Sequence, residues 1–181
     1  ARREWAVGRE LLDRGIPTAL PLLWAEKRVH AMMTENYLVT LGIERSVSFA
    51  QLWATLDNAE DRVTWMRILG ANVRLGHDNN FAHDDLSAQH VLVASAVNAF
   101  RNAPVCYYID LDRARTDGAV SAYRRAHNFF QVFRSLPEAT LGLEERKAFY
   151  DGYSRGVWQE EHTRAFDRAI ERIAALKIVG K

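Results

Sequence analysis

The side chains best suited to chemistry fall in two short stretches of the chain. The first reads FAHDDLSAQHVLV from Phe81 to Val93, and the second reads YYIDLDRAR from Tyr107 to Arg115. A carboxylate on a tight loop, such as Asp85, can accept the proton of an attacking hydroxyl group. A polar side chain five residues later, His90, and a carboxylate after the next strand, Asp110, can hold a Mg²⁺ ion that bridges nucleotide phosphates. The pattern therefore favours phosphoryl transfer.

The first stretch has the spacing of a kinase catalytic loop, H-x-D-L-x-x-x-x-N, with His90 at the position of the asparagine. Ile109-Asp110-Leu111-Asp112 occupies the position of the D-F-G metal-binding turn. We predict that Asp85 is the catalytic base and that His90 and Asp110 are metal ligands. Each half of the pattern is a weak signal, but the two occur in the right order and each adjoins an apolar, strand-like run.

The bulk composition bounds the remaining possibilities. With 181 residues, 48% of them hydrophobic, the chain can bury one core and a small second lobe. The net charge of +1 gives no field for nucleic acid, and the single cysteine, Cys106, suits a buried, inert thiol in a reducing compartment. No apolar run approaches the about 20 residues of a membrane span. Because the chain opens on Ala1-Arg2-Arg3 in helical pattern, we expect a piece of a longer protein.

The first third of the chain predicts a helix and two strands. Residues 2–14 have helical periodicity and end at Gly15 before Pro17. Leu20–Ala25 and Tyr37–Ile43 have strand composition, and we expect a polar loop around Met32-Thr34-Glu35 between them.

The rest of the chain predicts helices around one further hairpin. Ser48-x-x-Gln51 and Asp57-x-x-Glu60 have the pattern of capping boxes, the second opening a helix through about Leu75. We expect His77 in an exposed loop and His83 in a structural role. The remaining predicted elements are strands Val91–Ala96 and Val105–Ile109, and helices Val120–Leu136, Leu143–Arg155 and Gln159–Leu176.

The combination resembles the lipopolysaccharide core kinases, the bacterial heptose and 3-deoxy-manno-octulosonic acid kinases with a protein-kinase-like fold. The resemblance covers essentially the whole chain, and its most specific part is the pair of loop motifs, including the histidine in place of asparagine. The motifs that carry it are REW with RGIPT (3–5 and 14–18), YLVT (37–40), HDDLSAQHVLV (83–93) and IDLDRAR (109–115).

This resemblance implies an α+β, protein-kinase-like fold, with a partial N-terminal β lobe at 1–43 and a helical C-terminal lobe at 44–181. It implies Mg·ATP as phosphoryl donor, Asp85 as catalytic base, and His90 and Asp110 as metal ligands. The acceptor would be a sugar hydroxyl of the lipid-linked core at the cytoplasmic face of the inner membrane. That location allows peripheral membrane contact, and the resemblance implies neither nucleic acid nor an obligate protein partner.

The resemblance also assigns nucleotide contacts. The helix at 2–14 would be the kinase αC helix, whose glutamate pairs with a lysine on an earlier strand. Glu4 is the candidate for that glutamate and Glu10 the alternative. Backbone groups of Leu41 and Ile43 would form the adenine-binding hinge, and Leu92 would lie beneath the adenine ring.

Two departures from the kinase pattern matter. No glycine-rich loop or β3 lysine precedes the αC-like helix, so we expect this piece alone to bind ATP poorly and to be inactive. Asp84 stands where protein kinases have arginine, which argues against switching by activation-loop phosphorylation and favours a small-molecule or glycan acceptor over a protein.

Two other functions remain open from the sequence. His77-Asp78 and His83-Asp84 could belong to a metal-dependent HD phosphohydrolase, although such enzymes place their ligands on helices. The chain could also be a pseudokinase or interaction scaffold. The presence of both Asp85 and Asp110 argues against that second alternative.

Overall fold

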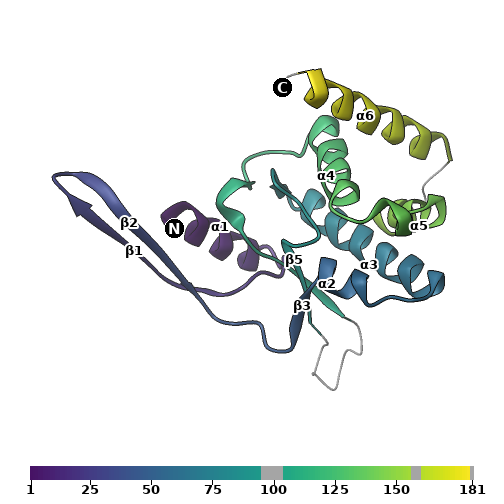
Figure 1. The fold of residues 1–181 in the computed structure, drawn as a ribbon. Coiled ribbons are helices and arrows are strands. Elements are labelled where there is room, and N and C mark those ends of the chain that lie inside the picture. Colours follow the sequence, from purple (N-terminus) through teal and green to yellow (C-terminus); the bar gives the residue numbers. More distant parts are fainter. Residues whose placement is uncertain (95–103, 156–159, 180–181) are drawn as a thin grey trace.

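The computed structural model describes residues 1–94, 104–155 and 160–179. A helical body lies on one side of the molecule, and an N-terminal helix with a long β-hairpin lies on the other (Figure 1). Small antiparallel sheets lie between them. Within the described ranges, no helix combines the length and the apolar character that a membrane span requires.

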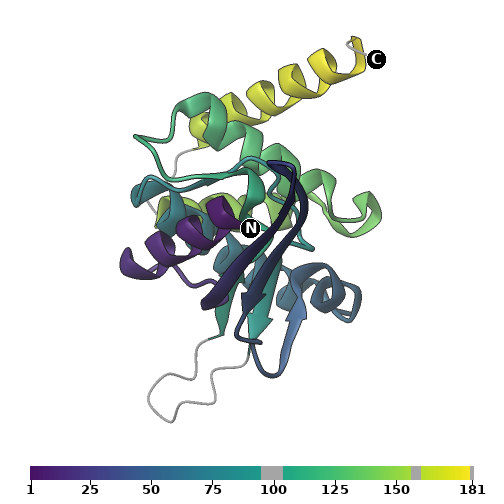
Figure 2. The same ribbon diagram turned by 90° about the vertical axis from the view of Figure 1, so that its left-hand side faces the viewer.

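The predicted first helix is confirmed as α1 (Arg2–Asp13). Its buried side consists of Val7, Gly8 and Leu11, at the spacing that places residues on one helical face. The chain then turns at Gly15, whose φ of +72° is a left-handed conformation that glycine adopts without steric cost. α1 packs against the hairpin, as Figure 2 shows from a second side.

The two predicted N-terminal strands exist, but the loop predicted between them is wrong. β1 (Pro21–Val29) and β2 (Met32–Thr40) form one antiparallel hairpin in which Val29 pairs with Met32. The turn consists of His30 and Ala31 alone, both with positive φ. The residues around Met32-Thr34-Glu35 therefore belong to β2. The usual Asn-Gly signal for such a turn is missing from the sequence, which is why both strands were predicted to stop short of the turn. The predicted second strand also continued to Ile43, whereas β2 ends at Thr40.

The hairpin predicted downstream is confirmed in the centre of the molecule. β5 (Val91–Ala94) pairs antiparallel with β6 (Val105–Tyr108), and the short β3 (Ser46–Ser48), which was not predicted, adds on the other side of β5. Residues 95–96 of the predicted strand and 97–103 of the connecting loop lie outside the described residues. The Thr18 hydroxyl donates to the Tyr108 carbonyl at 2.7 Å and so joins the segment after α1 to β6.

The first predicted capping box is confirmed, and the second is displaced by one residue. The Ser48 hydroxyl accepts from the Gln51 N–H at the start of α2 (Phe49–Ala54). For α3 (Ala59–Asp78), the cap is Asn58, whose side chain accepts from the Asp61 N–H at 2.8 Å. An Asn side chain caps as well as Asp does, so the two candidates compete in sequence.

α3 also runs further than predicted, and His77 is therefore not an exposed loop residue. The helix continues to Asp78, and the turn to the left-handed region comes at Asn80, with φ of 58°. His77 is only 2% exposed. The polar run after Gly76 resembled a helix end, but the His77 side chain faces the core and finds buried hydrogen-bond partners there.

The helical body is completed by α4 (Ala122–Arg134), α5 (Leu143–Ser154) and α6 (Glu160–Val179). The 3₁₀ turn η2 (Glu138–Thr140) lies between α4 and α5. Phe129, Phe130 and Phe133 of α4 are buried, which confirms their predicted place in the core. The Phe129 ring meets Phe149 edge-on at 5.1 Å, so α4 and α5 are joined by an aromatic cluster. Cys106 is also buried, and burial raises the pKa of its thiol to about 12.

Two glycines allow α3 and α5 to cross in direct contact. A Cβ atom at Gly70 would lie 2.0 Å from the Phe149 carbonyl oxygen, and one at Gly152 would lie 1.9 Å from the Arg67 carbonyl oxygen. Both obstacles are backbone atoms, so no side-chain rotation could relieve the clash. The close crossing fixes α3 against α5. The segment after α3, which includes the loop of Asp85, therefore starts from a rigid helix.

We predict that Gly70→Ala lowers the free energy of unfolding by about 3 kcal/mol or more, because the two helices must separate to admit a methyl group. Gly42→Ala is the control, since nothing lies within 4 Å of a Cβ built there. It should change stability by less than about 0.5 kcal/mol. Urea unfolding followed by far-UV circular dichroism measures both, and equal losses in the two variants would refute the close-crossing argument.

Candidate active site

The loop that carries Asp85 is pinned by a buried histidine. It begins after β4 (Ala82–His83), which pairs with β7 (Ala114–Arg115). The His83 ring is 1% exposed; its Nδ1 accepts from the Asp85 N–H at 3.2 Å, and its Nε2 lies 3.0 Å from the Ile109 carbonyl oxygen. Burial lowers the pKa of His83, so the ring is neutral and donates from Nε2. The predicted structural role of His83 is thus what the structure shows.

A second imidazole connects the backbone of Asp85 to the side chain of Asp110. His90 Nδ1 donates to the Asp85 carbonyl at 2.7 Å, and its Nε2 lies 3.3 Å from Asp110 Oδ2. The two histidine rings stack with centroids 5.7 Å apart. In a neutral His90 the Nε2 atom carries a lone pair, so a lone pair faces a carboxylate oxygen. Such a pair of electron-rich atoms suits a shared cation or a proton.

The distance between these two atoms fits a metal. Magnesium binds its ligands at about 2.1 Å in octahedral geometry, which places adjacent ligand atoms about 3 Å apart. Among the described residues, no group of three or more His, Cys, Asp and Glu side chains could hold a metal by itself. A divalent ion at His90 and Asp110 would therefore need further oxygen ligands, such as nucleotide phosphates or water.

Asp110 has a strained backbone conformation. Its φ and ψ are both 58°, in the left-handed region, and it lies between Ile109, which follows β6, and the 3₁₀ turn η1 (Leu111–Arg113). Aspartate tolerates this region better than most residues, but the conformation still costs energy. Such strain gathers at functional sites. Here it brings the half-exposed carboxylate opposite His90.

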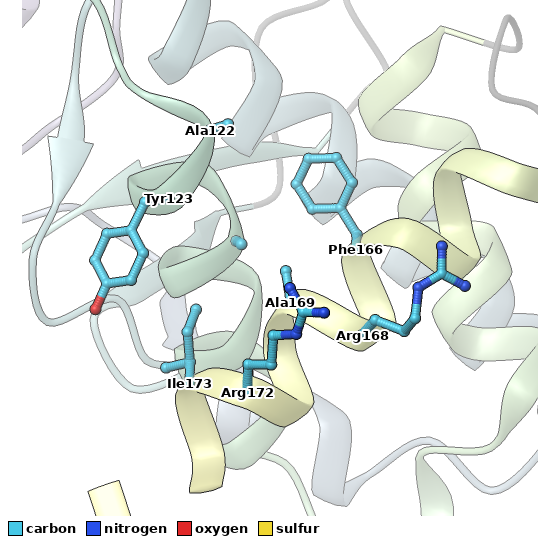
Figure 3. A pocket seen from close by; sticks show the side chains of 8 residues that line it. Ala122, Tyr123, Phe166, Arg168, Ala169, Arg172 and Ile173 are labelled. Atoms are coloured by element: carbon cyan, nitrogen blue, oxygen red, sulfur yellow. The ribbon is translucent and has the colours of Figure 1, made fainter. Parts of the chain in front are cut away.

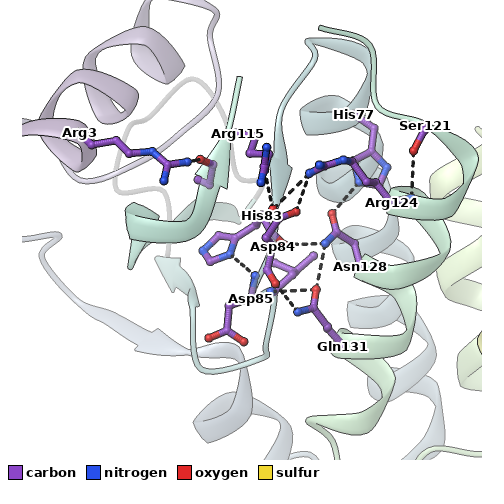
Figure 4. A network of polar contacts seen from close by, with 12 residues as sticks. Arg3, His77, His83, Asp84, Asp85, Arg115, Ser121, Arg124, Asn128 and Gln131 are labelled. Atoms are coloured by element: carbon purple, nitrogen blue, oxygen red, sulfur yellow. Dashed lines mark hydrogen bonds and ion pairs between the residues drawn. The ribbon is translucent and has the colours of Figure 1, made fainter. Parts of the chain in front are cut away.

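One face of α4 holds the backbone of the loop. Asn128 Nδ2 donates to the His83 carbonyl at 2.6 Å, and Gln131 Nε2 donates to the Asp84 carbonyl at 2.7 Å (Figure 4). Ser135 Oγ accepts from the Ala88 N–H at 2.8 Å. Sequence reasoning missed these residues. The available signal was a polar stripe at i, i+3 and i+7 within an otherwise aromatic helix.

Behind Asn128 lies the buried ring of His77. Its Nε2 lies 3.0 Å from Asn128 Oδ1, and its Nδ1 lies 2.9 Å from the Tyr153 hydroxyl. Burial lowers the pKa of His77 to about 4, so the ring is neutral near pH 7. With Nε2 as donor and Nδ1 as acceptor, His77 fixes the orientation of the Asn128 amide and, through it, the start of the loop.

Of the two candidate αC glutamates, Glu4 lies near Asp110. Glu4 and Asp110 line the same cavity of about 250 Å³ between α1, the hairpin and η1. Burial raises the pKa of Glu4, with nearby Asp110 acting in the same direction. Glu10 instead pairs with Arg14 and accepts from the Thr116 hydroxyl. The assignment of Glu4 to a nucleotide-linked ion pair remains a prediction.

The predicted adenine contacts are less well placed. The Leu41 N–H donates to the Leu20 carbonyl at 2.8 Å, so that donor is already used within the protein. The Ile43 carbonyl accepts from the Ser46 hydroxyl at 2.7 Å. Leu92 is half-buried in β5, opposite Ser48 and Tyr107. Contact of these residues with a nucleotide remains a prediction.

A larger cavity, of about 630 Å³, lies elsewhere, between α4 and α6 (Figure 3). Its walls are largely apolar, and Arg168 and Arg172 of α6 lie among them. None of its lining residues belongs to the loop of Asp85 or to the His90–Asp110 pair. Size alone therefore does not locate the chemistry in this protein.

The architecture is a protein-kinase-like α+β fold. A solved structure described as WaaP in complex with acyl carrier protein superposes with a TM-score of 0.70 and 21% sequence identity, over 95% of this chain and 76% of that one. The model of the lipopolysaccharide kinase (Kdo/WaaP) family matches residues 1–153, and the chain belongs to that family.

Curated relatives agree with this membership. The 3-deoxy-D-manno-octulosonic acid kinases of Xylella fastidiosa strains M23 and Temecula1 are each 27% identical over 133 residues, which is 74% of this chain. The chain spans about half (48%) of the length of these relatives.

The buried His77 predicts a pH dependence of stability. Its pKa is about 4 in the folded chain and near 6.5 when exposed, so the unfolded state binds more protons between these values. Stability is therefore full above pH 6.5 and is lost as the pH falls toward 4. From pH 7.5 to 5.0 we expect a loss of about 2 kcal/mol from this residue.

Urea unfolding at both pH values measures this loss. His77→Gln should reduce the difference between the two values, while His30→Asn, in the exposed hairpin turn, should leave it unchanged. His83 remains in both variants and contributes equally to each. An undiminished pH dependence in His77→Gln would show that His77 is not the group responsible.

Proposed function

We propose that the full-length protein transfers the γ-phosphoryl group of ATP to a sugar hydroxyl of the lipopolysaccharide core. The observation that carries the proposal is the single path from the Asp85 carbonyl through the His90 ring to the Asp110 carboxylate. That path holds a candidate base and a candidate metal pair in one fixed arrangement. Family membership and the similar 3-deoxy-D-manno-octulosonic acid kinases support the acceptor class.

The chemistry assigned to each side chain follows from this arrangement. The acceptor hydroxyl oxygen attacks the γ-phosphorus, its proton passes to the Asp85 carboxylate, and ADP departs. His90 Nε2 and Asp110 Oδ2 would hold Mg²⁺. When bound, Mg²⁺ offsets the negative charge of the phosphates. His83 and the α4 amides keep Asp85 in place, so that little reorganisation is needed during the reaction.

The lipid-linked acceptor would bring the protein to the cytoplasmic face of the inner membrane as a peripheral protein. The similar WaaP structure is a complex with acyl carrier protein. The transfer proposed here uses only side chains of this chain, the nucleotide, the metal and the sugar. Because the curated relatives are about twice as long as the chain, the activity belongs to the full-length protein.

The two rival functions have less support. In an HD phosphohydrolase His77 would bind a metal, but both of its ring nitrogens are hydrogen-bonded to Asn128 and Tyr153 in the core. A scaffold would not require the strained Asp110 opposite His90. Two assays separate the three functions. A kinase consumes ATP in the presence of magnesium, an HD phosphohydrolase hydrolyses phosphomonoesters, and a scaffold does neither.

We predict that Asp85→Asn in the full-length protein lowers kcat about 10³-fold, because the amide cannot accept the proton of the hydroxyl. Phosphate transfer from radiolabelled ATP to a core saccharide measures the rate, and circular dichroism checks the fold. Asp57→Asn is the control, since Asp57 is an exposed acid before α3. A rate for Asp85→Asn within tenfold of wild type would remove Asp85 as base.

His90→Asn tests the metal pair separately. The asparagine amide can donate to the Asp85 carbonyl and present its oxygen to a metal, so we expect at least about a tenth of the activity to remain. His90→Leu can do neither and should raise the Mg²⁺ concentration for half-maximal rate about tenfold or more. Equal behaviour of the two variants over a Mg²⁺ titration would contradict the ligand role.

A further inference from the structure

A three-way ion pair lies directly beside the proposed base. Both oxygens of Asp84 are engaged: Oδ2 lies 2.7 Å from Arg115 Nε, and Arg124 Nη1 lies 2.9 Å from Oδ1 and 3.2 Å from Oδ2. Figure 4 shows the Asp84 carboxylate turned toward the two arginines and the Asp85 carboxylate turned away from them. The family resemblance marks Asp84 only as a departure from the arginine of protein kinases, and neither it nor the proposed chemistry gives Arg115 and Arg124 a role.

The cluster joins three elements that the site depends on. Asp84 lies in the loop between β4 and Asp85, Arg115 ends β7 in the segment that follows Asp110, and Arg124 lies in the first turn of α4. The backbone pairing between the loop and that segment is only two residues long, Ala82 with Arg115 and His83 with Ala114. So short a ladder holds little by itself.

At the end of the segment, Arg125 Nε of α4 donates to the Val120 carbonyl at 3.1 Å, and two further side-chain hydrogen bonds join the segment to α1. Arg3 of α1 donates to the Ala114 carbonyl at 2.8 Å, and the Thr116 hydroxyl donates to Glu10 of α1. They fix the outer edge of the segment to α1. Among the described residues, the side-chain hydrogen bond and ion pair that join residues 111–120 directly to the catalytic loop are those of Arg115 with Asp84.

The charges are opposite to those of a protein kinase. There the catalytic loop carries an arginine, and the segment after the metal-binding aspartate becomes ordered when a phosphate is added to it and pairs with arginine. Here the carboxylate lies on the loop, and the arginines lie on the segment and on α4. A protein kinase gains an ion pair between these two elements by phosphorylation. This chain has such an ion pair without phosphorylation.

We propose that Asp84 is a positioning residue that permanently holds the segment 111–120 against the catalytic loop, so that the site is assembled without phosphorylation. The proposal rests on the proposed kinase function, since it explains how that site is kept in its working arrangement. Asp84 itself touches no reacting atom. It acts through the loop that carries Asp85 and through the segment that begins at Asp110.

The exposure of the cluster makes the proposal testable without unfolding the protein. The three side chains are 30 to 48% exposed, and ion pairs of that exposure contribute little to global stability. Asp84→Asn should therefore leave the fold intact while releasing the segment. Its amide keeps the shape of the carboxylate but lacks the charge that attracts both arginines.

The experiment is hydrogen–deuterium exchange on the full-length Asp84→Asn protein. We expect amide exchange in residues 111–120 to be about tenfold faster, with α3 and α5 unchanged. The kcat for sugar phosphorylation should fall about tenfold, with the KM for ATP within about twofold, because Asp85 is mispositioned while the nucleotide contacts persist.

Asp78→Asn is a matched control. Asp78 also bridges two arginines, Arg74 and Arg155, and its side chain is 31% exposed, but it joins the end of α3 to the end of α5. Its substitution should leave both the exchange of 111–120 and kcat unchanged. A charge-inverted protein, Asp84→Arg with Arg115→Glu and Arg124→Glu, should recover slow exchange, which a packing role for Asp84 would not permit.

The outcomes separate the inference from the function on which it rests. Unchanged exchange of 111–120 in Asp84→Asn would overturn the positioning role. If that variant unfolds globally, Arg115→Gln replaces it, because this change removes one of the two ion pairs. Unchanged exchange of residues 111–120 in Arg115→Gln would likewise overturn the positioning role. If wild-type protein transfers no phosphate while exchange responds as expected, the kinase proposal fails and the positioning role stands. A fall of more than threefold in the wild-type rate after phosphatase treatment would overturn assembly without phosphorylation.

Discussion

The candidate site depends on two stacked histidines that join two backbone segments. The first ring, His83, bonds both the Asp85 N–H and the Ile109 carbonyl, and the second, His90, bonds the Asp85 carbonyl and faces Asp110. Each ring therefore contacts one segment on each of its nitrogen edges. Asp85 is held at its backbone N–H and carbonyl, and the other segment is held at the Ile109 carbonyl and the Asp110 carboxylate. Backbone contacts leave less freedom than contacts between flexible side chains would.

Such an arrangement requires buried polar groups, and side chains of α3, α4 and α5 satisfy them. His77, His83 and Asn128 are each no more than 2% exposed within a core rich in phenylalanine and tyrosine. An unpaired polar atom at that depth costs about 1–3 kcal/mol. A series of hydrogen bonds, from Tyr153 to His77, from His77 to Asn128 and from Asn128 to the His83 carbonyl, gives these groups partners. Loss of one member leaves its neighbours unpaired, so the network is cooperative.

The sequence predicted that Asp85, His90 and Asp110 lie together, but it did not predict the residues that support them. The spacing of Asp85, His90 and Asp110 follows from a loop and a turn flanked by strands, and their convergence was read from local pattern alone. The two-residue strands β4 and β7 are too short to leave any periodicity. The burial of His77 and the loop contacts of Asn128 and Gln131 depend on how α3, α4 and α5 pack, which local propensity does not specify.

The histidine at position 90 can make the two kinds of contact for which an asparagine would be suited. An asparagine side chain has an N–H donor and an oxygen acceptor on the same amide carbon. A neutral imidazole has an N–H donor and a nitrogen acceptor that are bonded to the same ring carbon. In this chain the Nδ1 donor holds Asp85, and under the proposed role the Nε2 acceptor faces the metal. The replacement changes the ligand atom from oxygen to nitrogen. Because Mg²⁺ prefers oxygen ligands, the proposed site would give this ion one protein oxygen fewer than a site with asparagine would.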